Sequence, residues 1–428
     1  MRCRLKFRSV ASMRLKSSML VLVMAGECIF LLPFVFPRIL RPTILEVFNL
    51  TNLELGTAFS IYGIIALFSY FFGGPLADRF SARNLMTIAM VLTATGGIVL
   101  QKIPEVTPII ILYGFWGLST ILLFWAAMLR YTRILGGSNH QGSAYGILDA
   151  GRGLFAAILA SISIIILDRI LPSGGETATL QDKRTALIMI IRCYSVIVLL
   201  CGLLVYLVIP QEDKSSTSLA GQPVKLNEIL PVLKIPAVWL NALIVLCAYV
   251  GYKCTDDFSL YAYDVYGYGD VEAARVGNIS FWMRALSALL AGYLADRFAG
   301  SKIIVWGFVL TIVFSFIVAS GMLTGFGILP LFLNVTLLSL GIFGVRGVYF
   351  ALFNEGDIPF KWTGRAIGII SVIGFTPDIF MGPLMGYFLD TYPGQTGHQY
   401  VFGILCLFSV IGLTATLLLR RGIYGARN

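Results

Sequence analysis

The sequence predicts an all-α membrane protein with twelve transmembrane helices in two pseudo-symmetric six-helix bundles. Of its 428 residues, 57% are hydrophobic and 13% are charged, with a mean hydropathy of +0.85, whereas soluble domains carry about 25% charged residues. This length accommodates about twelve apolar spans of about 20 residues. The string "GGPLADRF" (Gly73 to Phe80) returns almost unchanged as "AGYLADRF" (Ala291 to Phe298), 218 positions further on. Solenoid repeats are only about 20–50 residues long, so the separation indicates that one half of the chain repeats the other.

Apolar segments separated by polar connections give the expected helices in chain order. They span residues 18–36, 56–76, 84–101, 106–129, 143–167, 185–209, 237–262, 274–295, 303–321, 328–352, 366–389 and 399–420. A long polar stretch predicts a cytoplasmic linker at 210–236, between bundles at 18–209 and 237–420, and residues 1–17 and 421–428 are expected to be cytoplasmic tails. The basic start resembles a signal peptide, but the apolar run after it contains Glu27 and no small-residue cleavage site follows. We therefore expect a retained first helix.

The distribution of basic residues predicts the topology and the location. With the N-terminus inside, about twenty Lys and Arg residues fall in cytoplasmic segments and seven fall outside, which is a positive-inside bias. We therefore expect a multi-pass protein of the plasma (inner) membrane with both termini in the cytoplasm, and a monomer. The net charge of +10 does not indicate nucleic acid, because the basic residues lie between apolar spans rather than in one stripe.

Cysteine and histidine usage gives no support for an enzyme. The seven cysteines lack CxxC spacing, and most fall within apolar spans, so we expect them to pack in the bilayer. Both histidines, His140 and His398, fall in predicted loops. No metal site, cofactor or nucleophile and base pair is expected.

A second repeated string completes the family signature. "QGSAYGI" (residues 141–147) and "TGRAIGI" (residues 363–369) each precede the fifth helix of a half. The two LADRF strings resemble the loop motif G-x-L-a-D-r-x-G-r-k of the major facilitator superfamily, and depart from it at residues 81–82 and 299–300. The matching residues are Gly74, Leu76, Ala77, Asp78, Arg79 and Arg83, then Gly292, Leu294, Ala295, Asp296 and Arg297. The resemblance covers about residues 17–421 and implies the major facilitator fold, with a substrate site at mid-membrane between the halves.

The resemblance also implies a cytoplasmic gate. Asp78 would face the start of the eleventh helix, where a carboxylate favours the helix dipole, with Arg365 as a charged partner. Gly74 and Gly292 would let neighbouring helices approach closely. The expected gate comprises Gly74, Asp78, Arg79, Gly292, Asp296, Arg297 and Arg365. The alternative is a simple turn that carries a solvated Asp–Arg pair.

Charged residues inside the expected spans are the candidate functional residues, because each is costly unless it faces a cavity or a partner. Arg284 and Arg346 offer planar forks for carboxylate or phosphate, and Lys253 adds a third cation. The expected substrate-binding residues are Lys253, Arg284, Arg346, Tyr249 and Trp125. Alternatively, these charges form salt bridges: Asp149 with Arg152 in helix five, Lys253 with Asp256 or Asp257, Arg284 with Asp378, or Arg346 with Glu27. Arg192 is the weakest candidate and is expected to reach the outer surface.

A buried carboxylate is easier to protonate than a solvated one, so the candidate proton carriers are Glu27, Asp256, Asp257 and Asp378. The sequence does not choose among them. It predicts a secondary transporter that imports a small organic anion of carboxylate or phosphate type, carboxylate siderophores included, by proton-coupled alternating access. A proton-driven exporter is the alternative, although helix five lacks the glycine-proline motif of drug antiporters. A non-transporting sensor or scaffold is the third hypothesis.

Overall fold

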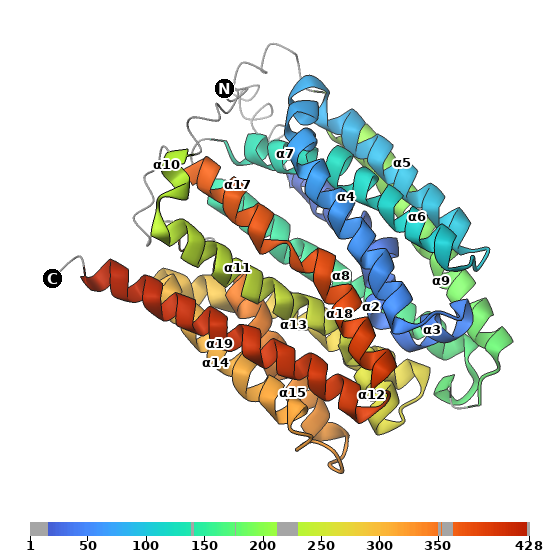
Figure 1. Ribbon diagram of the computed structural model, residues 1–428. Helices are drawn as coiled ribbons and strands as arrows, with labels where there is room; N and C mark the ends of the chain where they lie inside the picture. The colour runs from blue at the N-terminus through green and yellow to red at the C-terminus, as the bar shows by residue number, and fades with distance from the viewer. Residues whose placement is uncertain are drawn as a thin grey trace, which may run out of the picture.

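The computed structural model describes residues 16–137, 141–175, 177–211, 230–349, 352 and 363–425. These residues form helices and short connections, with no strand among them. Figure 1 shows the long helices lying side by side. From residue 52 onward, the helices in chain order are α4 (Asn52–Arg79), α5 (Ala82–Leu100), α6 (Val106–Gly117), η2 (Leu118–Trp125), α7 (Ala126–Gly136), α8 (Gln141–Ile170), η3 (Pro172–Gly175), α9 (Leu180–Val208), α10 (Leu230–Leu233), α11 (Pro236–Cys254), η6 (Thr255–Asp257), α12 (Phe258–Tyr266), α13 (Asp270–Arg297), α14 (Gly300–Ala319), α15 (Ile328–Val348), α17 (Thr363–Gly374), α18 (Pro377–Thr391) and α19 (Gln395–Gly425).

Within the described ranges, ten helices are long and apolar enough to cross a membrane, or eleven if a bent pair near the N-terminus counts as one span. The helix α13 also has 28 residues, but it lies outside that set. Two of these spans contain an irregular turn. The elements α6, η2 and α7 form one continuous span, and α11, η6 and α12 form another. The all-helical membrane architecture is therefore confirmed.

The first span is broken, which corrects the single helix predicted at 18–36. A helix at Lys16–Cys28 is followed by η1 (Leu31–Val35), and the segment Leu31–Ile39 is bent by 41° from the first helix. The chain continues through α2 (Phe36–Ile39) and α3 (Arg41–Phe48), where a loop was expected. Both short helices have proline in their first turn. Proline lacks a backbone N–H, and in the first turn this costs no hydrogen bond within the helix. As a result, Arg38 and Arg41 are buried instead of solvated.

The start of α4 also differs from the prediction, which placed it at residue 56. The Thr51 hydroxyl accepts a hydrogen bond from the Glu54 backbone N–H at 3.1 Å, and the Glu54 carboxylate accepts one from the Thr51 N–H at 2.8 Å. This capping box satisfies two backbone donors that a helix start leaves free, so the helix begins at Asn52. The string "TNLE" carries that signal in the sequence.

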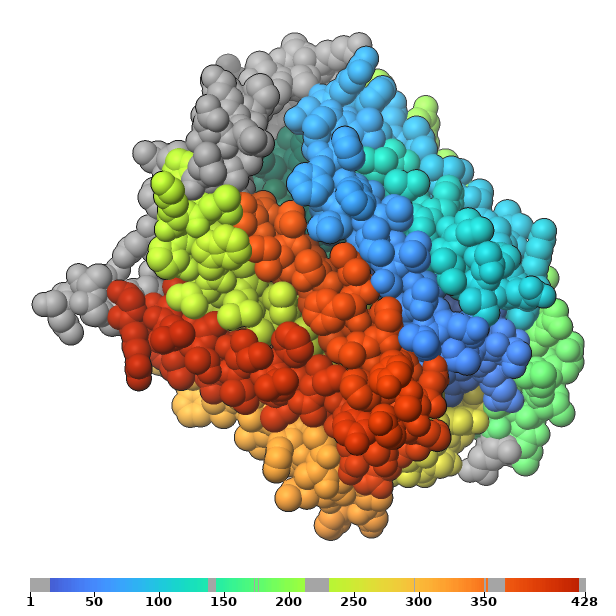
Figure 2. Space-filling model, viewed as in Figure 1, coloured from blue at the N-terminus to red at the C-terminus, as the bar shows by residue number. Residues whose placement is uncertain are grey.

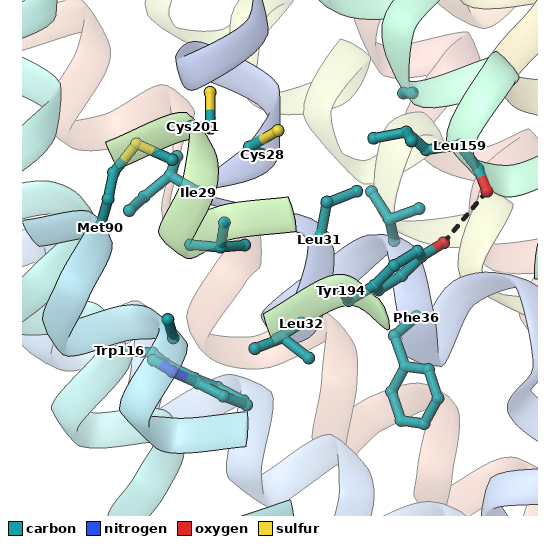
Figure 3. Packing of buried hydrophobic residues seen from close by; sticks show 14 of the residues in the cluster. Cys28, Ile29, Leu31, Leu32, Phe36, Met90, Trp116, Leu159, Tyr194 and Cys201 are labelled. Atoms are coloured by element: carbon teal, nitrogen blue, oxygen red, sulfur yellow. Dashed lines mark hydrogen bonds between the residues drawn. The ribbon is translucent and has the colours of Figure 1, made fainter. Parts of the chain in front are cut away.

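Buried apolar side chains form separate cores in the two parts of the chain. One core contains residues between Val21 and Ile209, together with three side chains of α13. The other two lie between Val232 and Leu419. Figure 3 shows the first core around Cys28 and Leu32 of the broken span, with Trp116 of α6 and Tyr194 of α9 beside them. Trp116 is fully buried and donates its indole N–H to the Thr93 carbonyl at 3.2 Å, so the burial leaves no unsatisfied donor.

The two parts of the chain meet closely where α4 packs on α18 (Figure 1). Glycines permit this approach: a Cβ added to Gly386 would lie 2.5 Å from the Asn52 carbonyl oxygen, and one added to Gly63 would lie 2.7 Å from the Asp378 backbone. Gly56 and Gly382 face each other in the same way. Small residues commonly mediate such contacts between membrane helices.

Among the described residues, α4 and α18 are joined at one end, and α4 and α17 are separated at the other. At the Asp390 end, the Asp390 carboxylate of α18 accepts hydrogen bonds from the backbone N–H groups of Asn52 (3.0 Å) and Leu53 (2.7 Å) at the start of α4. At the Asp78 end, a Cβ added to Gly74 would meet no atom within 4 Å. Figure 2 shows a recess at this end, between α4 and α17. We call these two ends the Asp390 end and the Asp78 end.

Candidate functional site

Four charged side chains from three separate segments meet around Glu27, and we call them the Glu27 cluster. The Glu27 carboxylate lies 3.3 Å from Arg152 Nε of α8 and 3.2 Å from Arg284 Nη1 of α13. Asp149 of α8 lies 3.9 Å from Arg152 and 3.7 Å from Arg284. Glu27 is buried, whereas 58% of the Asp149 side chain is exposed. Solvent therefore reaches one edge of the cluster.

The break in the first span positions Arg152. Its Nε donates a hydrogen bond to the Gly26 carbonyl oxygen at 2.9 Å. A Cβ on Gly26 would lie 3.0 Å from Arg152 Cδ, so glycine leaves room for the long side chain to pass. The guanidinium also lies 5.3 Å from the Trp125 ring centroid. These contacts hold Arg152 in one position beside Glu27.

A second set of four charges, the Asp256 cluster, joins the other part of the chain to α2. Asp256 forms an ion pair with Arg38, and its second oxygen lies 3.4 Å from Lys253 Nζ. Lys253 Nζ also lies 3.5 Å from Asp378 Oδ1 of α18, and Tyr249 OH donates to Asp378 Oδ2 at 2.8 Å. Lys253 and Asp256 are buried. Ion pairing offsets the unfavourable free energy of removing these charges from water, and buried charges need such partners.

The 3₁₀ turn η6 directs two neighbouring acids to different partners. Asp256 turns to Arg38 and Lys253. Asp257 turns to α19, where its Oδ2 lies 2.7 Å from His398 Nδ1. The sequence predicted a loop for His398, but the residue lies in α19 and is fully buried. This prediction was wrong because α19 begins four residues earlier than expected, at Gln395.

Arg346 of α15 differs from the four cations of the two clusters, because no carboxylate of the described residues lies within 4 Å of its guanidinium. The guanidinium carbon lies 3.9 Å above the Tyr252 ring centroid and 5.4 Å from that of Tyr249. Its Nη1 is buried and has no hydrogen-bond partner in the part of the chain that the structure describes. Cation–π contact offsets part of the desolvation, but it leaves this N–H donor unsatisfied.

The arrangement supports the salt-bridge alternative for most predicted site residues, although two of the expected pairs do not form. Arg284 pairs with Glu27 and Asp149 instead of Asp378, and Lys253 takes Asp378 instead. The expected pair of Arg346 with Glu27 does not form, because Glu27 pairs with Arg152 and Arg284 instead. The predicted pairs of Asp149 with Arg152 and of Lys253 with Asp256 do form. Arg192 is exposed and donates to Gln101 at 3.1 Å, as expected for a surface residue.

The gate residues are not assembled in this conformation. Asp78 and Arg79 are exposed, and Asp78 has no hydrogen bond or ion pair with the described residues. Gly74 and Gly292 have no atom within 4 Å of an added Cβ, which corrects the expected close approach. The helices diverge at the Asp78 end, which is the physical reason. The guanidinium of Arg297 lies 4.5 Å from the Tyr293 ring centroid, and the side chains of Asp296 and Arg365 lie outside the described part.

The sequence interpretation missed several buried residues. Arg38 and Arg41 fall in the connection between the helices predicted at 18–36 and 56–76, yet Arg38 pairs with Asp256 and Arg41 donates to Asn52 Oδ1 at 2.9 Å. Lys183 precedes the helix predicted at 185–209, but it lies 2.5 Å from Glu46 and 3.0 Å from Asp270. The prolines that start α2 and α3 were the available signal for a helix here.

Membrane-length helices that bury several charged side chains are typical of polytopic membrane proteins with a functional site inside the bilayer. The chain belongs to the major facilitator superfamily, because the model of that family matches residues 19–376. Members of the family are transporters and not enzymes, and the same holds for this multi-pass inner membrane protein. The resemblance predicted from the LADRF strings is confirmed.

Individual relatives agree with this membership. The chain is 28% identical over 382 residues to the inner membrane protein YqcE of Escherichia coli (strain K12), covering 86% of each chain. It is 25% identical over 241 residues to the probable nitrate/nitrite antiporter NarK1 of Thermus thermophilus, covering 55% of this chain and 51% of that protein. A crystal structure of a mutant of the nucleoside transporter NupG superposes with a TM-score of 0.73 at 16% identity, covering 95% of this chain and 99% of that one. That likeness shows the fold alone.

Proposed function

We propose that the chain is a secondary transporter that imports a small organic anion of carboxylate or phosphate type, coupled to protons. The observation that carries this proposal is the unmatched charge of Arg346. The Glu27 cluster and the Asp256 cluster each contain two cations and two carboxylates. Arg346 therefore adds a positive charge that neither cluster neutralises, and its Nη1 is a buried donor without an acceptor among the described residues.

An anionic substrate supplies what Arg346 lacks. A charge buried without a partner is unfavourable, and a carboxylate or phosphate can accept two hydrogen bonds from one guanidinium. Tyr252 and Tyr249 hold the guanidinium from one side, which fixes its orientation before the anion arrives. Arg284, Lys253 and Trp125 border the site through the two clusters. The relative NarK1, named as a nitrate/nitrite antiporter, is consistent with an anionic substrate.

The proposal includes the full topology. We take α13 as a further span, because its 28 residues are long enough to cross the bilayer. Together with the bent first span this gives twelve helices, with bundles at 18–209 and 237–420 and both termini in the cytoplasm. The Asp78 end then faces the cytoplasm, and the conformation is open to the inside. The Asp78 gate is proposed to form when this end closes.

Uptake into proteoliposomes tests the proposal. The panel comprises glycerol 3-phosphate, succinate and nitrate, with uridine as an uncharged comparison. We expect an anion to be transported, and Arg346→Gln to reduce that uptake by about 10- to 100-fold, because charge-assisted hydrogen bonds contribute about 1.5–3 kcal/mol. Arg346→Lys keeps the charge but loses the planar fork, so an intermediate loss is expected.

The matched control is Arg192→Gln, which removes an exposed arginine of the same chain. It is expected to transport at the wild-type rate. Wild-type uptake by Arg346→Gln, or transport of uridine in preference to every anion, would exclude the anion site. Import is distinguished from the alternative of export by vesicles that hold more substrate inside than outside, under a proton gradient directed inward. Proton-coupled import adds substrate to these vesicles, whereas proton-driven export releases it.

A further inference from the structure

A histidine between two carboxylates lies apart from the central clusters. His398 of α19 is fully buried, and its Nδ1 lies 2.7 Å from Asp257 Oδ2 of η6. Its Nε2 lies 3.2 Å from Asp264 Oδ2 of α12. We call these three residues the His398 triad. Asp257 is also fully buried, whereas 30% of the Asp264 side chain is exposed.

The hydrogen-bond geometry of the triad fixes its proton count. A neutral imidazole has one N–H donor and one acceptor nitrogen, and an ionised carboxylate only accepts. A neutral His398 between two ionised aspartates would therefore leave one ring nitrogen facing a carboxylate lone pair, with no proton between them. Both contacts are satisfied when the ring carries a second proton. The triad thus accommodates one proton more than a neutral histidine with two carboxylates.

The surroundings of the triad provide no other positive charge for these carboxylates. Among the described residues, His398 is the one cationic partner within 4 Å of Asp257 or Asp264. The nearby cations are engaged elsewhere, since Arg38 and Lys253 hold Asp256, and Lys183 holds Glu46 and Asp270. Other titratable or charged groups on the neighbouring elements include Cys254 of α11, Tyr261, Tyr263 and Tyr266 of α12, Glu46 of α3, Lys183 of α9 and Asp270 of α13.

Asp257 also has an unsatisfied atom. Its Oδ1 is buried without a hydrogen-bond partner among the described residues, so the imidazolium is the main stabilisation that this carboxylate receives. Loss of the proton would leave two carboxylates beside a neutral ring, whose single N–H can donate to only one of them. Neither carboxylate would then face a positive charge, and a buried charge without a counter-charge is strongly unfavourable.

We propose that the His398 triad is the site that binds the coupling proton. Asp264 gives it access to water, because this residue is the partly exposed member and lies near the end of α12, toward the Asp390 end. The step is a simple proton transfer, in which water at that face delivers a proton to the ring and no other bond changes. The coupling role rests on the proposed function, whereas the proton-binding site itself stands on the triad geometry.

The turn η6 connects the proton site to the closure of the Asp390 end. Asp256 and Asp257 are neighbours in this three-residue turn. Asp256 holds Arg38 of α2, from the other part of the chain, while Asp257 holds His398. A shift of Asp257 away from an unprotonated ring would move Asp256 away from Arg38. Protonation of the triad therefore favours the closed Asp390 end that this structure displays.

Nitrogen NMR of the ring tests the proton site directly, without any substrate. The chain has two histidines, His140 and His398, so protein labelled with ¹⁵N-histidine in nanodiscs gives two ring systems. His140→Gln leaves the His398 signals alone. At about pH 7.5, where a solvated imidazole with a pKa of about 6.5 is about nine-tenths neutral, we expect His398 to carry protons on both nitrogens. Asp257→Asn is expected to shift the ring to the neutral form.

A neutral His398 ring at that pH would overturn the proton site, whatever the transport assays give. A second measurement tests the coupling. With the same anion panel, His398→Gln is expected to reduce accumulation driven by a pH gradient by about tenfold, a typical coupling between two sites, and to reduce anion exchange by less. His140→Gln is the matched control and should accumulate normally. Wild-type accumulation by His398→Gln would overturn the coupling role of the triad. Wild-type uptake by Arg346→Gln, in contrast, would exclude only the anion site.

Discussion

The hydrogen bonds of Asp390 give a sharp prediction about the closed end of the molecule. The carboxylate accepts from the N–H groups of Asn52 and Leu53, at 3.0 and 2.7 Å, and from Asn52 Nδ2 at 3.1 Å. It therefore adds a negative charge and two acceptors to the N-terminus of α4. Because Asp390 belongs to α18, in the other part of the chain, these bonds form only while the Asp390 end is closed.

The magnitude follows from related measurements on helix termini. A carboxylate near a helix N-terminus contributes about 0.3–1 kcal/mol, and an N-cap side chain contributes about 1 kcal/mol. Asp390 is exposed, so solvent screening reduces the charge contribution. We estimate about 1 kcal/mol for the loss in Asp390→Asn, which shifts the ratio of closed to open molecules about fivefold, since 1.36 kcal/mol is tenfold.

Spin-label distances between the Asp390 ends of α4 and α18 measure this ratio, after replacement of the seven native cysteines. The matched control is Asp168→Asn, which breaks an exposed pair of Asp168 in α8 with Arg275 in α13 at 3.6 Å. Exposed pairs contribute about 0–1 kcal/mol, so we expect a shift of less than about twofold. Equal shifts in both variants, or an unchanged distribution in Asp390→Asn, would refute the assigned role of the hydrogen bonds.

Two further predictions concern stability in detergent. Glu27→Gln leaves Arg152 and Arg284 with the exposed Asp149 alone, so we expect a loss of about 3–5 kcal/mol, as when one member of a buried pair is removed. Asp149→Asn should lose under about 1 kcal/mol, and a larger loss than in Glu27→Gln would contradict the burial argument. Gly386→Val would place a side chain against Asn52 and Leu53 and should lower thermal stability by about 1–3 kcal/mol. Gly403→Val in α19 meets no atom within 4 Å of its Cβ, and an equal loss there would exclude the packing explanation.

The fold was predictable because its signals are local or repeated. Apolar spans indicate membrane helices wherever they occur, and the two LADRF strings indicate a duplicated chain without any knowledge of contacts. The broken first span was missed because an apolar run reads as one helix, although Pro33, Pro37 and Pro42 lie in or just beyond it. Proline is tolerated in the first turn of a new helix as well as in a loop. The sequence pattern therefore fits both a broken helix and a helix followed by a loop.

Most residues of the site were predictable, but the pairs between distant segments were not. Unusual charges inside apolar spans identified Glu27, Lys253, Arg284 and Arg346. Their partners depend on which helices cross at the same depth, and a difference of one helical turn, 5.4 Å, exchanges one partner for another. His398 was missed for a related reason, because its polar neighbours place it near a helix end, and only the fold brings it beside Asp257.

The most direct test of the central claim is a structure determined with the transported anion bound. The account predicts that an oxygen of the anion lies within about 3 Å of Arg346 Nη1, the donor that has no partner in the described residues. The Glu27 and Asp256 clusters should keep their internal pairs in that complex. An anion bound elsewhere, with Arg346 Nη1 still unpaired or paired with a carboxylate of the protein, would contradict the claim.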